Sequence, residues 1–427
     1  MIASGSDGTR KTALATRIVA LVAPVLLTGL ARAEDRVPIT WKGKNLNAAS
    51  LPKDLGEAPR VAIAAWEPWA RAAGYRMDLD EQGRALVLTR ASRSRSRDIL
   101  PLLVWGGSWF DGVLPVPPPR TGETPKASPG SVPETSDAIP EDPEAPPQGS
   151  ERQKEFHVRS ESAWGSGSLE PDSRTATLIA LADEKDQESV LAYLGEHHPD
   201  LREWAARAAK EVGFVLEIPL VAAYVESASG QEEWSPAHEI LNRIVRLLTL
   251  RRFGQLPNWL QHAIAWEAET AYDGSIWVYP YRDEFVYTVE HAAWPSEIKK
   301  EFEGRASKPL EMEELSRWKP RTWDGACARH AFGFFHYLAE EKADAVPTLL
   351  EDFRRFRDAN DRKPAGDGTW TRSPDWEPTP EAQLAILKAR CGETVLADAS
   401  RWMASMPTTR TRTAEREESS SAPGRRR

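Results

Sequence analysis

The sequence predicts an α+β protein, in which a helix-rich domain with a small sheet follows a small N-terminal α+β module. Apolar residues recur at helical spacing through much of residues 175–406, and short runs of strand length are few. Residues 34–113 also combine one helical pattern with an alternating one. Residues 114–174 separate the two regions and are rich in Pro, Ser and Glu. Because they hold almost no large apolar residues, we expect a disordered linker there.

Both ends of the chain have patterns of their own. Residues 1–33 place basic residues before an apolar run and end in Ala-Arg-Ala, which is typical of a secretory signal peptide. A retained N-terminal anchor is the alternative. No later apolar run is long enough to span a membrane, so the cleaved chain is expected to be extracytoplasmic, either periplasmic or secreted. Residues 407–427 are polar, and we expect a disordered tail.

The overall composition limits the classes of function. The chain has 427 residues and a formal net charge of -9, which disfavours nucleic acid as a partner because such proteins present a basic face. Only two cysteines are present, Cys327 and Cys391, so a disulfide scaffold and a four-cysteine zinc module are both excluded. Two buried thiols or a single disulfide bridge remain possible.

The N-terminal module is predicted from two local patterns. Apolar residues at helical spacing predict a helix over residues 58–73. Residues 75–79 and 85–89 alternate on either side of a turn that contains Gly83, which predicts a β-hairpin. The Arg/Ser run at residues 90–97 is interpreted as a charged loop, with polyanion binding as the alternative.

The second region is mostly helical by its period. An apolar stripe predicts a helix over residues 236–250, and a Gly/Pro break separates it from a helix over residues 258–272. Strands are expected at 177–181 and 219–225, and further helices at 186–194, 201–212, 324–342, 344–358 and 380–404.

The helix over residues 236–250 carries the pair His238-Glu239 near its start. In a zinc peptidase the motif HExxH puts two imidazoles on one helix face and a general-base Glu beside them. Here Asn242 stands in the place of the second His. A neutral amide oxygen is a weak zinc ligand, so the motif is degenerate at this position.

The next helix begins with Trp259-Leu-Gln-His262-Ala-Ile-Ala265. This segment, and the order of a strand, the helix with His238-Glu239 and later helices, resembles the gluzincin metallopeptidases, the thermolysin and aminopeptidase-like group of the peptidase MA superfamily. The resemblance covers residues 175–405. It implies a peptidase-like fold with His238 as a zinc ligand and Glu239 as general base. It also implies that His262 occupies the third ligand position, where the family has Glu, so two of three ligand positions depart from the pattern.

Two main functions follow from this resemblance. The leading hypothesis is a pseudoenzyme with no cofactor, which acts as a binding or scaffold protein; Glu239 and His262 then only hydrogen-bond between adjacent helices. The alternative is a divergent metal-dependent peptidase or hydrolase in which His238 and His262 bind zinc and Asn242, Glu267 or Glu269 completes the site. The partner is unknown in both cases, with a peptide or cell-wall ligand in the old cleft as the expected class.

Other aromatic and imidazole residues are weaker candidates. The chain has 17 Trp, which gather in residues 41–109 and 259–323 and which either fill the core or bind glycans or cell wall. His330 and His336 lie six residues apart, so a regular helix does not direct both at one site. No phosphate-binding loop or nucleophile elbow is present in the sequence.

Overall fold

The computed structural model describes residues 37–90, 93–116, 157–158, 174–209, 213–226, 235–281, 284–288, 293–304, 309–317, 325–360, 362–364, 370–372 and 377–407. The predicted signal peptide, most of the predicted linker and nearly all of the predicted tail lie outside these residues. The predictions made for those segments therefore stay predictions.

Helices predominate over strands, and the predicted α+β class is confirmed. The α-helices are α1 (Glu57–Ala73), α2 (Arg93–Val113), α3 (Glu184–His197), α4 (Arg202–Ala208), α5 (Pro236–Phe253), α6 (Asn258–Asp273), α7 (Trp294–Gly304), α8 (Met312–Ser316), α9 (Gly325–Glu341), α10 (Val346–Asn360), α11 (Pro380–Cys391) and α12 (Val395–Ala404). The strands are β1 (Ile39–Trp41), β2 (Lys44–Leu46), β3 (Arg76–Leu79), β4 (Ala85–Thr89), β5 (His157–Val158), β6 (Ala176–Leu181), β7 (Gly213–Leu216), β8 (Val221–Val225), β9 (Val278–Tyr281), β10 (Glu284–Thr288), β11 (Arg362–Pro364) and β12 (Trp370–Arg372).

A mixed sheet of seven strands has the order β2-β1-β3-β4-β6-β8-β7. The predicted hairpin is present as the antiparallel pair β3 and β4, and β6 and β8 are the two strands predicted in the second region. Strand β7 was not predicted and pairs antiparallel with β8 at the sheet edge.

The sheet joins the two regions that the sequence predicts as separate modules. Strand β4 pairs in parallel with β6 along its whole length, from Ala85 opposite Ala176 to Thr89 opposite Ala180. Residues 37–113 therefore share one sheet with the residues that follow the predicted linker. Within that linker, His157–Val158 form β5, which pairs with β12. Leu114 is fully buried, so the ordered N-terminal part extends past the predicted boundary.

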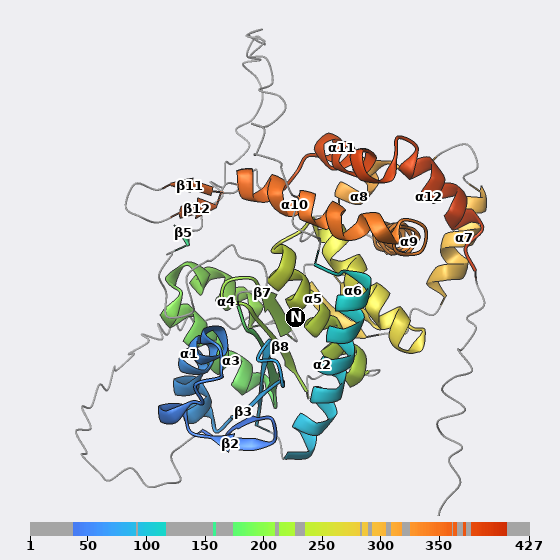
Figure 1. The fold of residues 1–427 in the computed structure, drawn as a ribbon. Coiled ribbons are helices and arrows are strands. Elements are labelled where there is room, and N and C mark those ends of the chain that lie inside the picture. Colours follow the sequence, from blue (N-terminus) through green and yellow to red (C-terminus); the bar gives the residue numbers. More distant parts are fainter. Residues whose placement is uncertain are drawn as a thin grey trace, which may run out of the picture. The chain divides into compact units, whose positions relative to one another are not determined.

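Helices cover both faces of the sheet (Figure 1). Alternate residues of a strand point to opposite faces. Leu86 and Leu88 of β4 accordingly belong to the core under α1 and α3, whereas Ala85 and Val87 belong to the core shared with α2 and α5. Burial on both faces explains why the central strands read as short, continuous apolar runs.

Helix α2 corrects the sequence interpretation of residues 90–97 as a charged loop. The helix starts inside this run, contains Pro101, and packs along α5. A Cβ atom at Gly106 would lie 3.1 Å from Leu241 Cδ1, so a residue without a side chain lets the two helices approach closely. The Arg/Ser run and the internal Pro and Gly residues interrupt the apolar periodicity, so the sequence pattern does not predict this helix.

Helix α6 packs between α5 and α9, and α12 packs against α7 and α9. The helix predicted over residues 380–404 is two helices, because Gly392 adopts a positive φ of 102° after α11. Helices α7 and α8 were not predicted. Among the residues that the structure describes, no helix combines the length and the apolar character needed to cross a membrane.

Candidate functional site

His238 lies in the first turn of α5, which begins at Pro236, and it is only 2% exposed. Its Nδ1 atom is 2.6 Å from Ser235 Oγ, and its Nε2 atom is 3.0 Å from Asp273 Oδ1 at the end of α6. A neutral ring with its proton on Nε2 accepts from the Ser235 hydroxyl and donates to the Asp273 carboxylate. Both nitrogens of the predicted zinc ligand are thus used within the protein.

Glu239, the predicted general base, is buried in an ion pair with Arg243, one turn further along α5. The Arg243 Nε and Nη2 atoms lie 2.8 Å and 2.6 Å from Glu239 Oε1. The Arg243 side chain is fully buried, so this carboxylate is the counter-ion of a charge that has been removed from water. The ion pair gives Glu239 a structural role.

Asn242, at the place of the second histidine, links α5 to α6. Its Nδ2 atom donates to Glu269 Oε1 at 2.7 Å. The backbone N–H groups of Trp277 and Val278 donate to the other carboxyl oxygen of Glu269 at 2.7 Å and 3.1 Å. Burial raises the pKa of Glu269 from its ordinary value of 4.5 to about 8, although these three donors oppose the shift.

His262, at the third ligand position, is buried on α6 beside two guanidinium groups. Burial, and then the positive charges of Arg246 and Arg243, hold its pKa well below the ordinary value of 6.5, so the ring is neutral. Burial also lowers the pKa of Arg246 to about 9, and Arg243 adds to this effect. Two positive charges therefore act on His262, and its ring also contacts Trp266.

Neither His238 nor His262 belongs to a convergent group of three or more His, Cys, Asp or Glu side chains among the described residues. A set of at least three His, Cys, Asp or Glu ligand atoms, all within 4.8 Å of one another, occurs once among the described residues. That set is Glu267, His336 and Glu340, and it includes none of His238, Glu239 and His262. Of the residues considered for completing the zinc site, Glu267 belongs to this other group, and Asn242 and Glu269 bond to each other.

The Glu267–His336–Glu340 group joins α6 to α9. His336 Nδ1 is 3.0 Å from Glu267 Oε1 and 2.9 Å from Glu267 Oε2. The His336 ring stacks on Phe332 with a centroid distance of 5.6 Å and meets the edge of Trp402, on α12, at 5.3 Å. Glu267 is buried, His336 is half-buried and Glu340 is exposed, so one side of the group faces solvent.

This group was missed at the level of sequence. The i, i+4 spacing of His336 and Glu340 on one helix was an available signal, because such residues lie on the same helix face. His330, by contrast, lies 2.7 Å from Glu301 and 3.7 Å from Glu314, so the two histidines of α9 do face different surroundings, as expected.

The remaining candidates mostly have structural surroundings. Cys327 and Cys391 are both buried free thiols, so they do not form the single disulfide bridge that was the other possibility. Most described Trp side chains lie in the core; those under 8% exposed are Trp41, Trp66, Trp69, Trp259, Trp266 and Trp294. An open groove of about 500 Å³ lies between α3 and α4. Its lining combines Leu191 and small residues with the charged Glu188, Glu196 and Arg202, and it includes none of the predicted site residues.

No model of a known protein family matches the chain, and no curated protein is similar to it. The side-chain contacts of α5, α6 and α9 are therefore the observations that bear on function.

Proposed function

We propose that the chain is a gluzincin-like pseudoenzyme that acts outside the cytoplasm as a binding or scaffold protein. The observation that carries the proposal is the buried ion pair between Glu239 and Arg243. A zinc peptidase needs this carboxylate to accept a proton from the metal-bound water. In this chain the same carboxylate neutralises a fully buried guanidinium, and removing that partner leaves an uncompensated charge in the interior.

The surroundings of His238 support the same proposal. A zinc ligand offers a lone pair on one ring nitrogen and fixes the ring through the other. Here one nitrogen bonds Ser235 and the other bonds Asp273, so the ring ties the start of α5 to the end of α6. Together with Asn242 and Glu269, these contacts make the former ligand positions into a link between two helices.

Hydrolysis by the full chain tests the catalytic part of the proposal. We expect a zinc-supplemented preparation to cleave a library of quenched fluorescent peptides no faster than His238→Ala and Glu239→Gln variants do. Cleavage by the wild type that both substitutions abolish, in variants that remain folded by circular dichroism, would overturn the proposal in favour of the divergent hydrolase.

The binding part needs its own measurement. We expect a displayed library of random peptides, panned against the full chain, to enrich a related set of sequences. A synthetic peptide from that set should bind the wild type and a His238→Ala variant equally and be recovered intact. Failure to enrich any sequence, or cleavage of the bound peptide, would contradict a peptide-binding pseudoenzyme.

A further inference from the structure

Three side chains with metal-binding atoms converge where α9 packs on α6. His336 and Glu340 are four residues apart on α9, so they lie one turn apart on the same helix face. Glu267 comes from α6, and the ligand atoms of all three lie within 4.8 Å of one another. The packing of two long helices, rather than a mobile surface loop, therefore sets the spacing of these groups.

The chemistry of the group fits a divalent transition-metal ion. Two carboxylates balance the charge of the ion, and a neutral imidazole adds a nitrogen ligand of the kind that zinc accepts. Two ligands bound at about 2.0–2.1 Å in a tetrahedral site lie roughly 3.3 Å apart. The Glu267 oxygens are 3.0 Å and 2.9 Å from His336 Nδ1, so the separation of these two ligands has to grow by only a few tenths of an ångström. The ligand atom of Glu340 lies within 4.8 Å of both.

The imidazole is held in position before any ion arrives. Its ring lies nearly parallel to Phe332, with an interplanar angle of 9°, while Trp402 meets it at 73°. These rings fix the direction of Nδ1 toward Glu267. Glu267 is 8% exposed, so its carboxylate is confined as well, and a ligand with few rotamers loses little entropy on binding.

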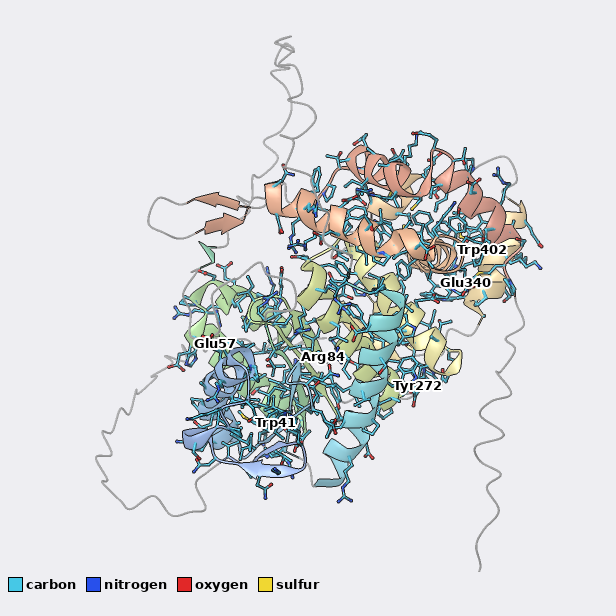
Figure 2. All side chains as sticks on the ribbon, in the orientation of Figure 1. Trp41, Glu57, Arg84, Tyr272, Glu340 and Trp402 are labelled. Atoms are coloured by element: carbon cyan, nitrogen blue, oxygen red, sulfur yellow. The ribbon has the colours of Figure 1, made fainter. Side chains whose placement is uncertain are left out.

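We propose that Glu267, His336 and Glu340 form a zinc site separate from the predicted centre on α5. Three protein ligands leave one tetrahedral position for water or for an anionic oxygen of a ligand. Glu340 is the exposed member of the group, and Figure 2 labels it together with Trp402, whose ring contacts His336. The exposed side of the group therefore gives water or an anionic ligand access to the ion. This proposal goes beyond the proposed function and does not require it.

Zinc binding by the full chain tests the site, with Zn²⁺ alone as the titrant in calorimetry and elemental analysis after dialysis as the second measurement. We expect about one zinc per chain, an affinity at least about tenfold weaker in Glu340→Gln, and a similar or larger loss in His336→Ala. Glu341→Gln removes the same charge one residue further along α9, where the side chain is also exposed, and is the matched control that should bind as the wild type does.

Glu340 is exposed, so its variant tests the site even if His336→Ala fails to fold. Cobalt substitution adds a readout independent of affinity: the visible absorption of bound Co²⁺ should change in Glu340→Gln and not in Glu341→Gln. The proposal is overturned if the wild type binds no zinc, or if Glu340→Gln binds zinc as tightly as Glu341→Gln does. Zinc lost only in His238→Ala would overturn it too, and would place the metal at α5, against the proposed function as well.

Discussion

The two faces of α6 carry similar residues in opposite settings. Toward α5, Glu269 is buried and bonds Asn242, and His262 is buried near the positive charges of Arg246 and Arg243. Toward α9, Glu267 bonds His336, and a second carboxylate lies in the exposed part of the group. The comparison teaches that residue type does not make a ligand. The buried Glu269 carboxyl group, which accepts only from donors of the protein, maintains the fold, whereas the group that includes Glu340 has a side exposed to solvent.

Among the substitutions that test this difference, the largest effect is expected at Glu239. Glu239→Gln removes the charge that neutralises the buried Arg243, so we expect the free energy of unfolding to fall by about 3–5 kcal/mol. Urea denaturation at neutral pH measures it. Replacing both partners by apolar residues, Glu239→Leu with Arg243→Met, should recover most of the loss. An unchanged midpoint in the single variant would show that the ion pair does not stabilise the fold.

The next largest effect is a pH dependence at Glu269. Its pKa in the folded chain, about 8, lies above the ordinary value of 4.5, so the folded state keeps a proton that the unfolded state has released. The resulting stabilisation is fully present below pH 4.5 and is lost as the pH rises to 8. Between pH 5 and pH 8 the wild type should lose on the order of 3 kcal/mol more stability than Glu269→Gln. Parallel stability curves for the two proteins would refute this.

A smaller effect is expected at Ser235, whose hydroxyl contacts His238 in place of capping α5. Ser235→Ala leaves a buried ring nitrogen without that donor and should cost about 1–2 kcal/mol. Ser296→Ala is the control, because the Ser296 hydroxyl bonds a backbone oxygen at an exposed position. Thermal unfolding should separate the two variants, and equal midpoints would argue against a structural role for the contact.

The smallest effect is expected at Glu340, in the group between α6 and α9. Glu340→Gln makes the same chemical change as Glu239→Gln, but at an exposed residue, and in metal-free buffer it should alter the free energy of unfolding by less than about 0.5 kcal/mol. With zinc added, the wild type should gain thermal stability that this variant lacks. If the metal-free variant is as damaged as Glu239→Gln, the two groups do not differ in the way proposed.

The parts of the fold that sequence predicted are those with local signals. Helices α5, α6 and α9 were predicted from apolar residues at helical spacing, and the hairpin of β3 and β4 was predicted from two short strand-like segments on either side of a turn at Gly83. The pairing of β4 with β6 has no such signal, because parallel strands meet through a connection of many residues. For the same reason we predicted two modules from the sequence, whereas the sheet of the structure is continuous.

The candidate site follows the same rule. The positions of His238, Glu239 and His262 on their helices were predictable, but their partners were not, since Asp273, Arg243 and Arg246 become neighbours only after α5 and α6 pack. His336 and Glu340 have a local spacing, whereas Glu267 lies 69 residues before His336 in the chain. A group of ligand atoms that comes from two helices is visible only in three dimensions.

The parallel pairing of β4 with β6 has a consequence for any shortened form of the protein. A chain that starts at residue 175 would expose the edge of β6, with unpaired N–H and C=O groups and apolar side chains on both faces. Such an edge is a template for pairing with another copy. Residues 37–89 therefore cover the edge of β6 and prevent this pairing, although the sequence predicts that they form a separate module.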